Sequence, residues 1–383
     1  MIDYKKYFNI LCWSINPDYQ SIPDTKGMDW YDFYQFACEQ AIAGVAFVGI
    51  QRLGEHGVKP PLDVLMQWIA SASLIEQQNK AVNKAATELF KELKNDGLRG
   101  CILKGQGNGL MYPNVYSRTP GDIDVWVRMA DGREKREEGR GKMEDGRRMM
   151  EDVQGIIKYV KERNPNGKVC YHHIDGGKIG GVEVEVHYRP SFMNNPIHNY
   201  RLQKWYKMMA EGGRLMEEVE LPEGVGSIPV PTVEFNVVYQ LVHVFRHLLQ
   251  EGIGLRQIID YFYVLKSNTN HTDDTNIIVL LNYLGLTKIA GAMMWLLSEV
   301  LGLEEEYLIV PKNECLGKVL LAEILKGGNF GQYDIDNIKV NSQLGKNWQR
   351  IRRDFRMMRY FPSECIWEPV FRVYHFFWRK MYG

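Results

Sequence analysis

One short stretch, Gly121-Asp122-Ile123-Asp124-Val125-Trp126-Val127, constrains the fold of this chain more than any other. Its alternation of acidic and apolar residues predicts a β-strand, because side chains along a strand repeat every two residues. Asp122 and Asp124 then point to one face, and Ile123 and Val125 to the other. Two carboxylates about 7 Å apart on one face repel each other unless a positive group lies between them. Divalent cations with oxygen ligands provide such a group, although a solvated strand face is the alternative interpretation.

A glycine-rich turn comes before the acidic strand. The apolar run from Leu98 to Lys104 is followed by Gly105-Gln106-Gly107-Asn108-Gly109, which predicts a strand, a turn and the start of a helix. Such a turn directs backbone N–H groups and the positive end of a helix dipole at one point, and this favours phosphate. The turn has neither the Gly-Lys-Ser/Thr of a Walker A loop nor the Gly-x-Gly-x-x-Gly spacing of a dinucleotide fold. A flexible strand-to-helix connection is the alternative.

A second acidic strand is predicted downstream, over 181–189. Glu183, Glu185 and His187 share one face of this strand, and three valines share the other. For Glu183 we favour a solvated edge of the sheet. Glu185 is a candidate third carboxylate, because two cations about 3.5–4 Å apart require bridging carboxylates and a further ligand from a neighbouring strand.

The remaining patterns predict helices on both sides of a small α/β centre. We expect an α+β fold with an N-terminal helical region at 1–97, a mixed-sheet core at 98–195 and a C-terminal helical domain at 196–383. Within the core, segments 169–174 and 178–189 are predicted to form a hairpin with its turn at Asp175-Gly176-Gly177. The insertion at 131–148 is rich in charge and glycine, and we expect an exposed loop or a helix extension there.

Histidines are a further group of candidates. His243 and His247 stand at i and i+4 and therefore share one face of a predicted helix. A zincin requires Glu directly after the first His, but Val244 stands there. The two histidines either pack inside the helical domain, with Asp260 as a hydrogen-bond partner, or face the metal cleft and contact substrate. On the predicted hairpin, His172 and His173 alternate in direction, so at most one is expected to face the site.

Three motifs together carry a family resemblance. The order Leu103-Lys104-Gly105, then Arg118-Thr119-Pro120-Gly121-Asp122-Ile123-Asp124, then Glu185-Val186-His187-Tyr188-Arg189 resembles the DNA-polymerase-beta-like nucleotidyltransferase superfamily. It is more closely similar to the uncharacterised bacterial nucleotidyltransferase proteins often encoded near polysaccharide genes. One departure concerns the first loop. The superfamily has Gly-Ser there, and the serine helps to hold the triphosphate, whereas this chain has Gly105-Gln106.

The resemblance implies a metal-dependent transfer of a nucleoside monophosphate from NTP to a small-molecule, sugar or protein acceptor. It implies catalytic residues that also bind Mg²⁺ or Mn²⁺, namely Asp122, Asp124 and Glu185. It further implies nucleotide-binding residues, namely Lys104, Gly105, Gln106 and Arg118. Three histidines are candidate substrate contacts: His187, His243 and His247. A catalytically inactive scaffold or regulatory protein with the same fold is one alternative, and a metal-dependent phosphohydrolase is another.

Composition excludes several other classes. Lys and Arg number 47 and Asp and Glu also 47, so the chain has no overall positive charge to attract nucleic acid, which argues against a template-reading polymerase. The six cysteines are scattered without a Cys-x-x-Cys pair, which argues against a disulfide framework and a structural zinc site. Neither a signal peptide nor an apolar run of about 18 residues is present, so we expect a cytoplasmic protein without a transmembrane segment. The aromatic end at 360–379 predicts a packed helix, with a membrane-surface role as the alternative.

Overall fold

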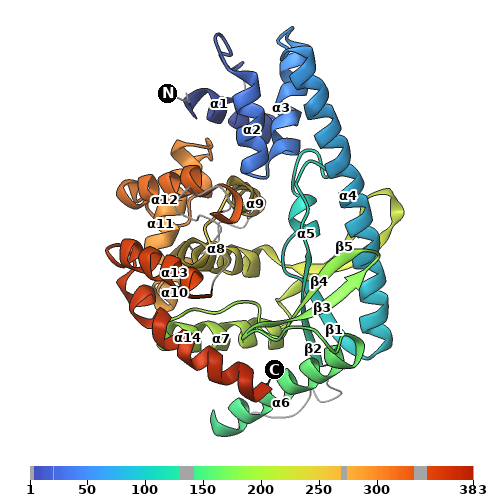
Figure 1. Cartoon of the computed structure of the whole chain (residues 1–383), viewed down its shortest axis with the longest axis vertical. Helices are drawn as coiled ribbons and strands as arrows, with labels where there is room; N and C mark the ends of the chain where they lie inside the picture. Colours follow the sequence, from blue (N-terminus) through green and yellow to red (C-terminus); the bar gives the residue numbers. More distant parts are fainter. Residues whose placement is uncertain (1–3, 20, 130–141, 269–273, 332–342, 383) are drawn as a thin grey trace.

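A computed structural model describes the chain except for residues 1–3, 20, 130–141, 269–273, 332–342 and 383. Helices make up most of the molecule, and a four-stranded sheet lies to one side of them (Figure 1). The predicted α+β class, a small mixed sheet with helices on both sides in sequence, is confirmed. Among the described helices, none combines the length and apolarity that crossing a bilayer requires.

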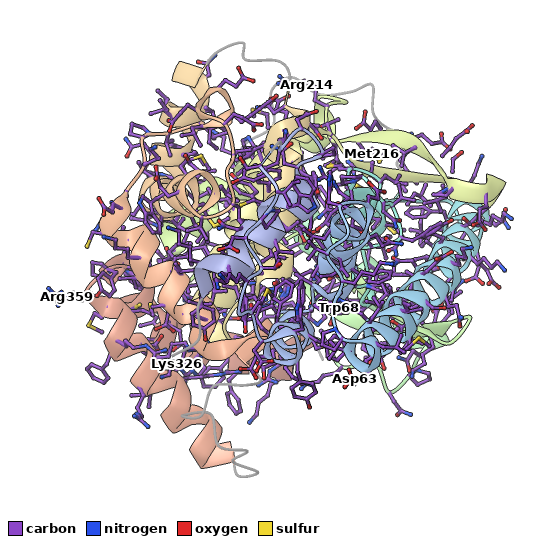
Figure 2. The ribbon with its side chains drawn as sticks, turned by 90° about the horizontal axis from the view of Figure 1, so that it is seen from above. Asp63, Trp68, Arg214, Met216, Lys326 and Arg359 are labelled. Atoms are coloured by element: carbon purple, nitrogen blue, oxygen red, sulfur yellow. The ribbon has the colours of Figure 1, made fainter. Side chains whose placement is uncertain are left out.

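Four helices precede the sheet: α1 (Tyr4–Ile15), α2 (Trp30–Glu39), α3 (Ala43–Glu55) and α4 (Leu62–Asn95). The Asp29 side chain caps α2 by accepting from the backbone N–H groups of Tyr31 and Asp32. Trp68 of α4 is fully buried and donates from its indole to the Ala43 carbonyl. In Figure 2 it lies among the packed helices, whereas Arg359 projects at the edge of the molecule. The second half of α4 continues along the sheet (Figure 1).

The main sheet has the strand order β1-β2-β4-β3. Its strands are β1 (Leu98–Ile102), β2 (Ile123–Met129), β3 (His173–Ile179) and β4 (Val182–His187). Strands β2 and β4 are parallel, and the two outer pairs are antiparallel. Two helices lie between the strands in sequence, the short α5 (Gln106–Gly109) and α6 (Lys142–Arg163). Residues 131–141 of the predicted insertion lie outside the described part of the chain, and α6 begins at Lys142, within the insertion.

The hairpin between β3 and β4 turns at a different place from the predicted one. Its two-residue loop is Gly180-Gly181, and both residues have positive φ, +55° and +85°. A two-residue hairpin turn with positive φ at both positions favours consecutive glycines, which explains why the turn lies at Gly180-Gly181. The predicted turn at Asp175-Gly176-Gly177 is wrong, since this segment is a register irregularity within β3. There the Asp175 carboxylate accepts a hydrogen bond from the Gly177 backbone N–H.

Helices dominate the rest of the chain. They are α7 (Pro196–Glu211), α8 (Val233–Gln250), α9 (Leu255–Ser267), α10 (Asp274–Leu284), α11 (Thr287–Glu299), α12 (Glu314–Gly327), α13 (Gln343–Met358) and α14 (Pro362–Tyr382), with short 3₁₀ turns at Pro222–Gly224, Glu305–Tyr307 and Asn329–Gly331. Between α7 and α8 an antiparallel pair, β5 (Met216–Leu221) and β6 (Gly226–Pro231), interrupts the helices. The sequence patterns did not predict this pair.

The two faces of the main sheet contribute to different apolar cores. Ile123, Val125 and Val184 belong to a cluster with residues of α4 and α6, and Trp378 of α14 joins it. On the opposite face, Trp126 belongs to the larger cluster formed by the helices, and its ring contacts Phe235 of α8. The polar residues of β2 and β4 therefore lie between the sheet and the C-terminal helices.

Candidate active site

Asp124 is the centre of the polar face. Its side chain is 3% exposed, with Lys104 Nζ 3.0 Å from Oδ2 and His187 Nε2 3.0 Å from Oδ1. Burial alone would raise the pKa of Asp124. The positive charges of Lys104 and His187, with the hydrogen bond from His187, outweigh burial and hold the pKa below its ordinary range. Asp124 is therefore an ionised carboxylate in an environment that excludes water.

The strand register brings Glu185 to this centre. Asp124 and Glu185 are direct partners across the parallel pair β2–β4, so their side chains lie on one face of the sheet. Glu185 Oε2 lies 3.5 Å from His187 Nε2. Burial would lower the pKa of His187, but hydrogen bonds to Asp124 and Glu185 raise it above its ordinary value. His187 is thus a positive link between two carboxylates.

Asp122 stands just before β2 and is half-buried. The charge of Asp124, and then burial, raise the pKa of Asp122 to about 6. This electrostatic coupling supports the expectation that the two aspartates share one site. Asp122 also lines a pocket whose other charged residues are Lys104, Arg118, Arg256 and Asp260.

The residues at this centre suit a divalent cation. Asp124, Glu185 and His187 each offer a ligand atom, and the three atoms lie within 4.8 Å of one another. The buried Oδ2 of Asp124 accepts no hydrogen bond within the described part of the chain and is approached by the Lys104 ammonium. Carboxylate oxygens are the ligands that Mg²⁺ and Mn²⁺ prefer. The ligand atoms of these three residues therefore suit the predicted Mg²⁺ or Mn²⁺.

The glycine turn is packed against neighbouring elements. Gly105 has a φ of +82° and precedes α5, which has only four residues, so the helix dipole expected there is small. A Cβ on Gly107 would lie 2.8 Å from Val230 of β6, which explains the glycine at this position. The Gln106 side chain, which takes the place of the superfamily serine, is 6% exposed. Binding of a triphosphate by Gly105 and Gln106 stays a prediction.

Arg118 forms an ion pair that the sequence did not indicate. Its Nε and Nη2 donate to the two carboxylate oxygens of Asp260 on α9, at 2.7 and 2.8 Å, and the Tyr112 hydroxyl donates to the same carboxylate at 2.6 Å. Burial would raise the pKa of Asp260, but the Arg118 charge and these hydrogen bonds lower it. Asp260 is thus a partner of Arg118 and Tyr112, whereas the sequence suggested a partnership with the histidines of α8.

The two α8 histidines differ in their surroundings. His243 is 7% exposed and lines the pocket beside Lys104. Burial, and then the charge of Lys104, push its pKa well below the ordinary value. His247 lies 3.2 Å from the Glu251 carboxylate, and burial followed by the charge of Arg246 lowers its pKa to about 4. The structure thus brings His243 to the pocket and pairs His247 with Glu251.

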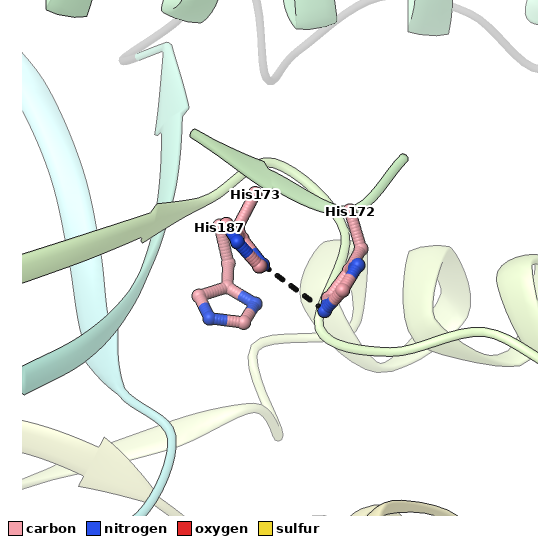
Figure 3. A group of neighbouring side chains, drawn as sticks. All are labelled: His172, His173 and His187. Carbon is pink, nitrogen blue, oxygen red and sulfur yellow. Dashed lines mark hydrogen bonds between the residues drawn. The ribbon is translucent and has the colours of Figure 1, made fainter. Parts of the chain in front are cut away.

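Two features of the site were missed from the sequence. Arg256 lines the pocket and contributes a third cation there, and burial followed by the Arg118 charge lowers its pKa to about 10. Its position four residues before Asp260 on α9 was the available signal. In addition, His172 and His173 both reach the site, so the expectation that at most one does so is wrong (Figure 3). Strand β3 begins only at His173, and His172 therefore does not follow the strand alternation.

Comparisons with known proteins identify the family of the chain. A family model described as an uncharacterised nucleotidyltransferase matches residues 26–302, well over half of the chain. No curated protein matches the chain. Among solved structures, it is similar to an antigenic nucleotidyltransferase-like protein from Paracoccidioides brasiliensis, with 12% sequence identity and a TM-score of 0.30. That match covers 62% of this chain and 96% of the other, and it is too weak to support an argument about the site.

Proposed function

Since the chain belongs to a family of uncharacterised nucleotidyltransferases, we propose that it transfers a nucleoside monophosphate from an NTP to an acceptor hydroxyl, with Mg²⁺ or Mn²⁺ as cofactor. The observation that carries the proposal is the pairing of Asp124 with Glu185 across β2 and β4, with Asp122 two residues upstream. Buried carboxylates gathered in this way are costly unless a cation or a hydrogen-bonded base balances them.

Asp122, Asp124 and Glu185 would hold the metal. When bound, the ion would lower the pKa of the attacking hydroxyl and neutralise charge on the leaving pyrophosphate. His187 keeps the Asp124 carboxylate in place through its hydrogen bond of 3.0 Å, and it contacts Glu185 as well. The histidine therefore acts as a positioning residue for the carboxylates in this proposal.

The pocket beside Asp122 would receive the triphosphate. Three cationic side chains line it, namely Lys104, Arg118 and Arg256. Lys104 has its ammonium 3.0 Å from Asp124 and can exchange this partner for a phosphate oxygen when a metal ion takes over the carboxylate. His243 and Gln240 line the same pocket from α8 and can contact the substrate there.

The test is incubation of the purified chain with Mg²⁺ or Mn²⁺ and labelled NTPs, followed by measurement of pyrophosphate release and label transfer. We expect activity in the wild type and none in the double variant Asp122→Asn, Asp124→Asn. Glu183→Gln is the matched control, because Glu183 is an exposed acid of the same strand as Glu185 and pairs with Lys178. Unchanged activity in the double variant, or a wild type that binds no nucleotide, would show that the proposal is wrong.

A catalytically inactive scaffold with this fold is the second candidate. Two observations favour it: Gln106 replaces the serine of the superfamily, and both Asp124 oxygens are already approached by Lys104 and His187. Calorimetric titration separates the candidates, because an enzyme that lacks only its acceptor binds metal and NTP, whereas an inactive scaffold does not bind the pair. Release of phosphate from NTP without transfer of label would instead favour a metal-dependent phosphohydrolase.

A further inference from the structure

Three imidazole rings lie together beside the carboxylates. His172, His173 and His187 each offer a ring nitrogen, and the three nitrogens lie within 4.8 Å of one another. Figure 3 shows the hydrogen-bonded pair His172–His173 next to the ring of His187. The cluster arises because His173 is the register partner of His187 across β3 and β4, while His172 comes directly before the strand.

The distances in this cluster are those of ligands that share one ion. Two ligand atoms bound to a tetrahedral zinc at about 2.0–2.1 Å lie roughly 3.3 Å from each other. His172 Nε2 is 3.1 Å from His173 Nδ1, and Glu185 Oε2 is 3.5 Å from His173 Nδ1. The third position would belong to His187, whose ring lies against both histidines, with centroids 5.2 to 5.3 Å away.

The bonding of His187 supports the same conclusion. Its Nε2 is hydrogen-bonded to Asp124, while its Nδ1 is buried and has no hydrogen-bond partner within the described part of the chain. A buried polar atom without a partner is unfavourable, and a bound cation would provide the missing interaction. A carboxylate that holds the far nitrogen of a histidine is also the usual arrangement around zinc ligands, since it orients the ring and raises its basicity.

We propose that His172, His173 and His187 form a three-histidine binding site for Zn²⁺ or a similar transition-metal ion, with the fourth coordination position open. Imidazole nitrogens favour Zn²⁺ over Mg²⁺, which prefers oxygen ligands. The site therefore differs in metal type from the carboxylate site at Asp122 and Asp124, although Glu185 lies beside both. The scattered cysteines argued against a structural zinc site, and this proposal departs from that expectation because its ligands are histidines.

The first experiment measures metal binding in the absence of nucleotide. The chain is freed of metal with a chelator and titrated with Zn²⁺ by calorimetry, and with Co²⁺ by visible absorption. We expect one equivalent of Zn²⁺ to bind in the presence of excess Mg²⁺, and the intense visible bands of four-coordinate Co²⁺. If the wild type binds neither ion, or if excess Mg²⁺ displaces the zinc, the proposal is wrong.

The second experiment uses variants. His172→Gln and His173→Gln should each weaken zinc binding at least about tenfold, since loss of even an outer partner of a zinc ligand costs 10- to 100-fold. The His173 side chain is 17% exposed, which makes this variant the safer one for folding. His56→Gln, a change at an exposed histidine outside the cluster, is the matched control and should bind zinc like the wild type. Unchanged affinity in folded His173→Gln would refute the site.

This proposal is independent of nucleotidyl transfer, and one variant separates the two. Asp122 is not among the three zinc ligands, so Asp122→Asn should retain zinc binding while it loses label transfer. Loss of zinc binding in that variant would show that a single shared site exists, and would overturn the proposal of a separate imidazole site.

Discussion

The two faces of strand β2 show how one short segment serves two purposes. Ile123, Val125 and Val127 are fully buried on the face that packs against α4 and α6. Asp124 is buried nearly as deeply on the opposite face, but it contacts Lys104 and His187. Burial of the apolar face stabilises the fold directly, at about 25 cal/mol per Å² of apolar surface. Burial of the charged face is tolerated only because each charge has a partner.

This difference indicates how substitutions on each face should affect the stability of the molecule. Loss of a methylene on the apolar face leaves a cavity and lowers stability without changing any charge. Loss of one charge on the polar face leaves its partner buried and unpaired, which costs more than the pair contributes. The following predictions test this contrast, in order of decreasing expected effect.

The largest effect on stability is expected from Asp260→Ala. The change leaves the guanidinium of Arg118, which is 5% exposed, without its carboxylate, and breaking a buried pair in this way costs about 3–5 kcal/mol. The free energy of unfolding, measured by urea denaturation, checks the value. The control is Asp96→Ala, which breaks the exposed pair between Asp96 and Arg163 and should cost no more than about 1 kcal/mol. Equal losses in the two variants would mean that burial does not decide the cost.

Substitutions at two neighbouring positions of β2 should have different effects, one on stability and the other on activity. Ile123→Ala removes a fully buried side chain from the apolar face and should lower stability by about 2–5 kcal/mol. At a temperature where it is folded, this variant should retain label transfer and zinc binding. Asp124→Asn should instead abolish label transfer. Thermal unfolding and transfer assays on both variants test the contrast, and loss of transfer in folded Ile123→Ala would contradict it.

Whether the sequence predicts a feature of this site depends on how far apart in the chain the interacting residues lie. Alternation within a strand is local, so the shared face of Glu185 and His187 on β4 followed from the period of two, whereas Asp122 precedes the first residue of β2. The placement of Glu185 directly opposite Asp124 is a register between strands about 60 residues apart. No local pattern contains that register, and the sequence suggested that the residues meet only through the need for a third carboxylate and through the family resemblance.

The features that the sequence did not predict also depend on contacts between residues far apart in the chain, or on where a strand begins. Arg118 and Asp260 pair across 142 residues, and neither sequence neighbourhood marks the other. The position of His172 depended on where β3 begins, and the sequence placed that strand and its turn several residues too early. Two glycine pairs, at 176–177 and 180–181, could each form the turn, and the local sequence did not distinguish them.

A smaller effect is expected from pH. Burial, and then the Lys104 charge, lower the pKa of His243 well below 6.5, so the folded state excludes a proton that the unfolded state binds. The stability from this group is complete above the unfolded pKa of about 6.5 and decreases as the pH falls below it. His243→Gln should therefore reduce the loss of stability between pH 7.5 and pH 5.5 by about 1 kcal/mol. Urea denaturation at both values checks this, and an equal loss in His243→Gln and the wild type would contradict it.

A similarly small effect is expected at Gly181, in the two-residue turn that joins β3 to β4. A Cβ at this position would contact nothing within 4 Å, so Gly181→Ala tests only the cost of a φ of +85°. For a residue with a side chain this cost is about 1–2 kcal/mol. The control is Gly54→Ala in helix α3, where φ is ordinary and space is open, and where alanine should be neutral or stabilising by up to about 1 kcal/mol. If Gly181→Ala also weakens zinc binding, the strain has shifted the register that places His173 opposite His187. If it lowers stability alone, the hairpin holds its register through the apolar face.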